Sequence, residues 1–79
     1  MEPRRNQDPA RVRRKRIEAG LTQIALAAEA GVSTAHMSSI ERGGRGASPK
    51  VLKRLAEALD CEIVDLMPKE PTPATGSVA

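Results

Sequence analysis

The chain has 79 residues, a formal net charge of +3 and no Phe, Tyr or Trp, which limits it to one small domain with an aliphatic core. Without Phe, Tyr or Trp it cannot stack bases on such rings, and this argues against single-strand and RNA-loop recognition. The single cysteine, Cys61, cannot form an internal disulfide, and the sequence shows no Cys/His metal cluster, no membrane-spanning apolar run and no secretory signal.

Positive charge is concentrated at the N-terminal end. Residues 1–16 hold seven basic and two acidic groups, a balance of +5, whereas residues 17–79 hold six basic and eight acidic groups, a balance of −2. A basic run alone is as often a solvated helix face or tail as a site for a polyanion. We expect residues 1–7 to form a disordered basic arm.

The first two helices are marked by their end signals. Asp8-Pro9 supplies a capping carboxylate followed by proline at the first helical position, and Gly20 ends this helix. Thr22 is placed to cap a second helix over about 23–30, which Gly31 ends in a left-handed conformation. The inward residues of the second helix would be Leu26, Ala27 and Ala30.

A third helix, over about 34–42, begins at a second capping residue, Ser33. Two short helices separated by Gly31-Val32-Ser33 are the layout of a helix-turn-helix that reads DNA. Short polar side chains suit a helix that enters a major groove about 12 Å wide. The inward residues would be Met37, Ile40 and Glu41, and the outward ones Thr34, Ala35, Ser38 and Ser39.

The rest of the chain predicts a loop, two further helices and a tail. Residues 43–47 form a glycine-rich loop, and Ser48-Pro49 repeats the cap-plus-proline start for a fourth helix. A last short helix over about 63–67 would bury Ile63 and Leu66, and residues 68–79 should be a disordered tail. The predicted fold is therefore all-α, with five helices in one domain over residues 8–67. The fourth helix carries an apolar stripe of Leu52, Leu55, Ala56 and Leu59.

The spacing of these residues resembles the lambda-repressor/Cro-like (Xre-type) helix-turn-helix family over about residues 9–67. The resemblance rests on Leu21-Thr22-Gln23, Leu26-Ala27, Gly31-Val32-Ser33, Ile40-Glu41-Arg42-Gly43 and the Leu52 to Leu59 stripe. It implies a five-helix domain with the helix-turn-helix at helices 2 and 3 and double-stranded DNA as partner. The sequence departs from the family pattern at Asp60, where Gly is usual, and at Ile24 and Ala25, where polar residues are usual.

The candidate DNA contacts fall into two groups. Hydroxyls and a methyl group on the third helix discriminate bases less sharply than Arg or Gln would, so the target sequence cannot be predicted. The alternative is that these side chains only cap the helix and contact solvent. Arg4 and Arg5 would reach a minor groove, and Arg13 is a further phosphate candidate, although solvent exposure is the competing interpretation for each arginine. The base-reading candidates are Thr34, Ala35, Ser38 and Ser39. The DNA-backbone candidates are Gln23, Arg42, Arg45, Lys50, Arg11 and Arg14.

Two further interpretations concern structure. Arg16 and Glu41 each share a face with core residues, so we expect a structural ion pair that locks helix 1 onto helix 3, as in the family. A surface pair between Glu41 and Arg45 is the alternative. Cys61 should fill an apolar slot between helices 4 and 5, with a redox switch as the alternative.

The leading functional hypothesis is a cytoplasmic, nucleoid-associated transcriptional repressor that binds a pseudo-palindromic operator as a homodimer. The alternative is an antitoxin or adaptor that binds a protein partner as well as DNA. A polymerase subunit could contact the exposed Ile24, although single exposed apolar residues are ordinary. The chain offers no paired nucleophile and base, so we expect no enzyme, no cofactor and no metal. The candidate dimer interface is Leu59, Ile63, Val64 and Met67.

Overall fold

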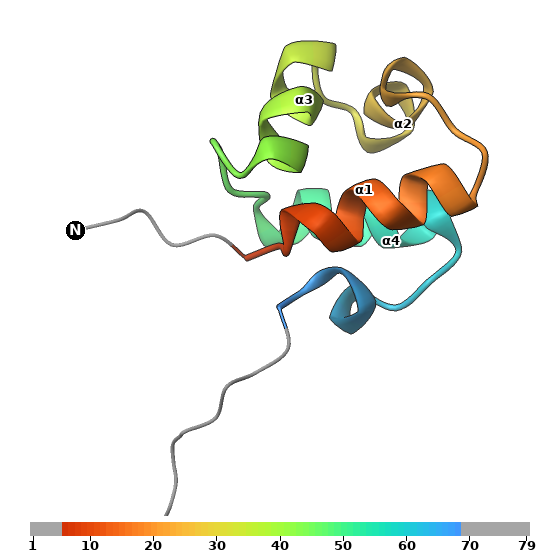
Figure 1. Ribbon diagram of the computed structural model, residues 1–79, viewed down its shortest axis with the longest axis vertical. Coiled ribbons are helices and arrows are strands. Elements are labelled where there is room, and N and C mark those ends of the chain that lie inside the picture. The colour runs from red at the N-terminus through yellow and green to blue at the C-terminus, as the bar shows by residue number, and fades with distance from the viewer. Residues whose placement is uncertain (1–5, 69–79) are drawn as a thin grey trace, which may run out of the picture.

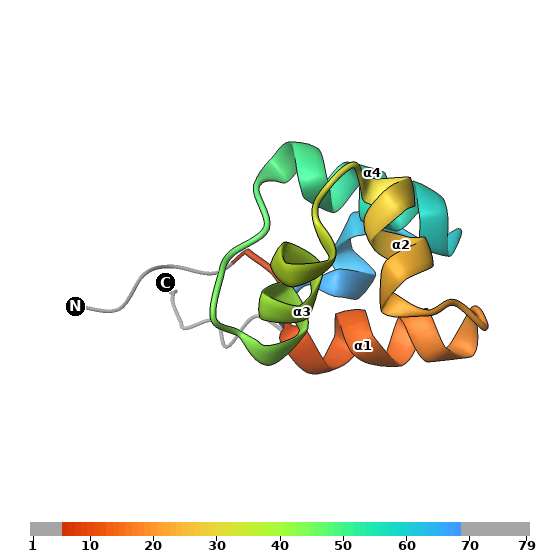
Figure 2. The same cartoon turned by 90° about the horizontal axis from the view of Figure 1, so that it is seen from above.

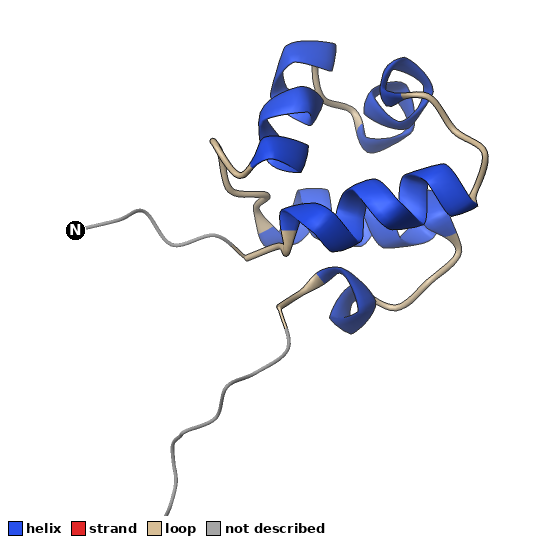
Figure 3. Ribbon diagram, viewed as in Figure 1, coloured by secondary structure: helices blue, strands red, loops and turns tan. Residues whose placement is uncertain are grey.

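The computed structural model describes residues 6–68, which are helical and contain no strand (Figures 1 and 3). The elements are α1 (Pro9–Glu18), α2 (Gln23–Ala30), α3 (Thr34–Arg42), α4 (Pro49–Leu59) and a 3-10 helix, η1 (Ile63–Leu66). The predicted all-helical fold is confirmed, but these residues form four α-helices rather than five. The fifth segment is a single turn closed by i to i+3 bonds, such as Asp65 N to Glu62 O at 3.0 Å, and it is too short to become α-helical.

Side-chain caps start all four α-helices. Thr22 Oγ1 accepts a hydrogen bond from Ala25 N at 3.0 Å, and Asp8, Ser33 and Ser48 cap the other three helices in the same manner. Gly31 and Gly43 end α2 and α3 with positive φ angles of 73° and 84°. Because these signals are local, they place the helix limits close to where the sequence predicts them.

The helices are arranged in three levels. In Figure 1, α2 and α3 lie together above α1 and α4, and η1 lies below them. Figure 2 shows α1 and α4 on opposite sides, where α1 packs on α3, α4 packs on α2, and η1 contacts both α1 and α4. The aliphatic core is made of Val12, Leu26, Ala27, Ala30, Met37, Ile40, Ala47, Leu52, Leu55, Ala56, Leu59 and Leu66.

The described N-terminal residues differ from the prediction. We expected disorder over residues 1–7, but Asn6 and Gln7 are held by hydrogen bonds to the segment around Ala47, and Gln7 is only 1% exposed. Their amide side chains match backbone groups that would otherwise be buried without partners. The rest of the predicted arm, residues 1–5, and the predicted tail after Pro68 lie outside the described residues.

Candidate nucleic-acid interface

Helix α3 has one buried face and one outward face. Met37, Ile40 and Glu41 are buried against the other helices, so the opposite side of α3 is left open. The structure brings the four base-reading candidates together on this outward side, with Thr34 and Ala35 exposed and Ser38 and Ser39 partly exposed. The face is shallow and polar, because its side chains are short, and a groove wall could approach the helix closely.

Arg42 extends this outward face. Its guanidinium donates hydrogen bonds to Ser38 Oγ and, at 3.5 Å, to Ser39 Oγ, one turn nearer the start of α3. Residues three and four apart share a helix face, so Arg42 lies on the same side as the two serines. The sequence placed Arg42 only at the flank of the helix, among the backbone contacts.

An ion pair and an amide join the first three helices. Arg16 Nε and Nη2 donate to the two carboxylate oxygens of Glu41 at 2.7 and 3.2 Å, and Gln23 Nε2 donates to Glu41 Oε1 at 3.1 Å. The Glu41 side chain is 2% exposed and that of Arg16 is 13% exposed. Arg16 Nη1 also donates to Leu21 O at 2.9 Å. The Glu41 carboxylate therefore faces α1 and α2, which leaves no place for the alternative surface pair with Arg45.

The start of α2 lies beside this cluster. The first intrahelical bond of α2 runs from Leu26 N to Thr22 O, and Thr22 Oγ1 accepts from Ala25 N. The N–H groups of Gln23 and Ile24 precede these donors and point out of the helix end, where an anion is favoured. The Gln23 amide keeps a second N–H beyond the one given to Glu41.

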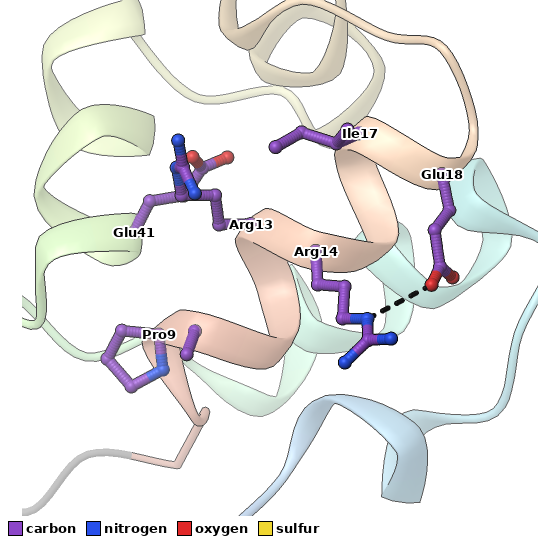
Figure 4. Close-up of a pocket in the computed structure, with 7 residues that line it drawn as sticks. Pro9, Arg13, Arg14, Ile17, Glu18 and Glu41 are labelled. Atoms are coloured by element: carbon purple, nitrogen blue, oxygen red, sulfur yellow. Dashed lines mark hydrogen bonds and ion pairs between the residues drawn. The ribbon is translucent and has the colours of Figure 1, made fainter.

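The arginines of α1 point in different directions. Arg13 and Arg14 both border a hollow of about 610 Å³ that Glu41 also lines, but the side chain of Arg14 turns away from α3 and pairs with Glu18 at 3.2 Å (Figure 4). Arg11 pairs with Asp8 at 3.5 Å. Arg11 and Arg14 also line a second hollow next to Asp65 of η1. The structure thus does not bring Arg11 and Arg14 to the face of α3.

The loop after α3 is fixed by a residue that the sequence analysis missed. Gln7 Nε2 donates to Ile40 O at 3.1 Å and to Arg45 O at 2.8 Å, and Gln7 Oε1 accepts from Ala47 N at 2.9 Å. Arg45 in this loop and Lys50 at the start of α4 are both exposed. No local pattern signals Gln7, because its partners lie 33 to 40 residues away in the sequence.

The apolar residues after α4 divide into buried and exposed members. Ile63, which we expected to be buried with Leu66, is exposed together with Val64 and Met67, and Val64 is the most exposed at 68%. Leu59, which we placed in the dimer interface, is instead buried in the core at 7% exposure. The last turn of α4 needs this side chain to cover the core, so Leu59 does not belong to an outer surface.

Other candidate chemistry is limited within the described residues. Cys61 packs against the core, and its pKa is raised by burial and, to a lesser extent, by the carboxylate of Asp65. Residues 6–68 contain no group of three or more His, Cys, Asp or Glu side chains suited to a metal ion. Within the same residues, no helix has both the length and the hydropathy needed to cross a bilayer.

Comparisons with known proteins agree with this geometry. The family model described as Helix-turn-helix matches residues 12–66. The HTH-type transcriptional regulator y4dJ of Sinorhizobium fredii is 43% identical over 65 residues, covering 81% of this chain and 80% of that protein.

Two similar solved structures belong to a controller protein and to a regulator. The restriction-modification controller protein C.AhdI of Aeromonas hydrophila is 36% identical with a TM-score of 0.71, covering 75% of this chain and 89% of the other. SinR of Bacillus subtilis, a master regulator for biofilm formation whose structure is a complex with DNA, is 30% identical with a TM-score of 0.69. That match covers 73% of this chain and 97% of SinR.

Proposed function

Because this chain belongs to the helix-turn-helix family of lambda-repressor-like (Xre-type) transcriptional regulators, we propose that it represses transcription by binding a pseudo-palindromic operator as a homodimer. The family binds double-stranded DNA and is a class of regulators rather than of enzymes. The observation that carries the proposal is the outward face of α3, where Thr34 and Ala35 are exposed while Met37 and Ile40 anchor the opposite side.

In this proposal α3 enters the major groove by its first turn. Thr34 and Ala35 meet base edges first, and Ser38 and Ser39 follow one turn later. Hydroxyl groups accept and donate, and the Ala35 methyl group can contact thymine. On the buried side of α3, the Arg16–Glu41 pair holds this helix against α1, which would fix its orientation for docking.

Phosphate contacts flank the reading helix. The start of α2 offers the backbone N–H groups of Gln23 and Ile24 together with the second N–H of the Gln23 amide. On the other side, Arg45 and Lys50 are exposed cations near the end of α3. These positions bracket α3, so one strand would be gripped on each side of the groove.

The dimer would form through the exposed apolar surface of η1. Ile63, Val64 and Met67 lie on one short segment, away from α2 and α3 in Figure 1. Two copies joined there would present their reading helices about 34 Å apart on one side of the duplex. A dimer bound in this manner would repress the promoter that it occupies. The protein would act in the cytoplasm, on the DNA of the nucleoid.

A selection from a random double-stranded DNA pool tests this function. We expect enrichment of a two-fold symmetric sequence, and affinity that falls by about 0.9 log unit per log unit of salt for each neutralised phosphate. Arg45→Ala should lower the affinity and reduce the salt slope by about 1. The control is Arg14→Ala, which removes the same charge from the η1 side of α1. This variant should leave the affinity and the salt slope unchanged.

Two outcomes would contradict the proposal. If no sequence is enriched, the chain does not read DNA, and if the affinity hardly changes with salt, the phosphate contacts are wrong. Sedimentation of Val64→Glu beside the unaltered protein tests the dimer, because a charge at an exposed apolar interface should shift the equilibrium toward monomer.

The antitoxin or adaptor function differs in its partner. Ile24 is 69% exposed next to the proposed phosphate contacts of α2, and a toxin or a polymerase subunit could dock on it. Co-purification of a stoichiometric protein that is lost in Ile24→Gln, with DNA binding retained, would favour this function.

A further inference from the structure

Arg42 is the one long cationic side chain on the outward face of α3 within the described residues. The four base-reading candidates on this face carry at most a hydroxyl or a methyl group, whereas Arg42 ends in a planar fork of five N–H donors. We propose that Arg42 is a base-reading residue, which recognises a guanine in each half-site, rather than a contact to the DNA backbone. This inference rests on the proposed function and identifies part of its target.

The direction of the side chain supports this role. Side chains of a helix lean toward its N-terminus, and the guanidinium of Arg42 reaches back to the hydroxyls of Ser38 and Ser39. Its charged end is therefore about one helical turn, roughly 5.4 Å, nearer the inserted end of α3 than its own Cα position suggests. It lies beside the base-facing serines instead of at the flank.

The charge of Arg42 is also free for DNA. The neighbouring carboxylate, Glu41, is buried on the opposite side and is occupied by Arg16 and Gln23. Among residues 6–68, Arg42 donates to two neutral hydroxyls and forms no ion pair with a carboxylate, so no acid there cancels its positive charge. Because the two serine contacts use two of five N–H groups, a pair remains to donate to the O6 and N7 acceptors of one guanine.

Ser38 and Ser39 would then act as positioning residues. Each accepts a hydrogen bond from the guanidinium, and together they limit the rotation of a long flexible side chain before DNA arrives. A fixed fork selects one orientation of base edges, whereas a free arginine could turn to a phosphate. This explains how a reading face of small residues could still discriminate strongly at one base pair.

Selection from a random double-stranded pool with matched variants tests the inference. The unaltered protein should enrich a sequence with a fixed G in each half-site. Arg42→Lys and Arg42→Ala should lose that preference while keeping the preferences at the other positions, because lysine retains the charge without the fork. Arg45→Ala should bind more weakly to the same sequence. Circular dichroism checks that each variant remains folded.

A chemical substitution in the selected operator gives a second readout. Replacing the G by 7-deazaguanine removes the N7 acceptor. Replacing the G·C pair by A·T keeps an N7 acceptor but puts the N6 amino donor of adenine where the O6 acceptor of guanine stood, so Arg42 would lose its two-bond contact. We expect the A·T replacement to weaken the unaltered protein roughly 5- to 150-fold, and both replacements to leave Arg42→Ala nearly unaffected. For each replacement, Ser38→Ala should lose less affinity than the unaltered protein does, because Ser38 would position the Arg42 guanidinium.

The outcomes separate the two proposals. If Arg42→Ala enriches the same sequence as the unaltered protein and loses affinity evenly at all operators, Arg42 is a backbone contact and this inference is wrong. If the unaltered protein enriches no sequence, both the proposed function and this inference are wrong. If the 7-deazaguanine penalty is the same with and without Arg42, another residue reads that guanine.

Discussion

Replacing Glu41 by alanine should destabilise the fold far more than loss of an exposed charge would. The Glu41 carboxylate is 2% exposed and accepts three hydrogen bonds, so its removal leaves the Arg16 guanidinium, 13% exposed, without a counter-charge. Removing one partner of a buried pair costs about 3–5 kcal/mol. We expect about 3 kcal/mol, the lower end, because Arg16 keeps its bond to Leu21 O and a narrow opening to solvent.

Urea unfolding followed by far-ultraviolet circular dichroism measures this loss, since the chain has no aromatic side chain for fluorescence. The control is Glu18→Ala, which breaks the exposed pair with Arg14 and should cost less than about 1 kcal/mol. The double variant Arg16→Met/Glu41→Leu should recover most of the stability, because no charge is then left unpaired. A loss below about 0.5 kcal/mol in Glu41→Ala would refute the reasoning.

Three other perturbations test separate features. Gln7→Met keeps the side-chain volume but removes the bonds to the loop after α3, so amide exchange in residues 44–47 should quicken while that of α2 stays slow, and equal protection would argue against the clamp. Gly31→Ala should lower the free energy of unfolding by about 1–2 kcal/mol, because φ is +73° and the new Cβ would displace Arg54; an unchanged urea midpoint would contradict this. Since the pKa of Cys61 is raised, its alkylation should rise with pH at higher values than in the urea-unfolded chain, and stability should fall as pH passes the ordinary thiol pKa, where the unfolded state ionises first. An alkylation profile at or below that of the unfolded chain would be inconsistent with burial.

The parts of the fold that were predictable from sequence are those that local chemistry decides. The side-chain oxygens of Thr22, Ser33 and Ser48 each accept a hydrogen bond from the backbone N–H three residues later, and Gly31 ends α2 in a left-handed conformation. Each helix limit can therefore be predicted from a few neighbouring residues. The inward positions of α3 also follow from the helical period, which requires Glu41 to point toward the core. The last segment is less readable, because four residues do not decide between an α and a 3-10 turn.

The candidate site was readable in position but not in arrangement. Periodicity places Arg11 and Arg14 on one face of α1 but cannot say that this face turns toward η1, since that depends on how α1 packs on α3. Leu59 belongs to the apolar stripe of α4, whose helical spacing predicts burial in the core. Assigning it to an outer interface therefore conflicted with that spacing. The role of Gln7 could not be predicted from the sequence, because a polar residue before a helix cap is common at a chain terminus. Its role follows only from the folded position of the loop that it binds.

The division of α3 into two faces has a consequence for how such a protein diversifies. Thr34 and Ala35 make no side-chain contribution to the core, whereas Met37 and Ile40 are buried in it and Glu41 is buried in an ion pair with Arg16. Under the proposed function, exchanging the outer set would therefore retarget the chain to a different promoter at little cost to folding, while the inner set must be inherited together. A duplicated copy could acquire a new regulon through a handful of substitutions, without first acquiring stabilising changes elsewhere.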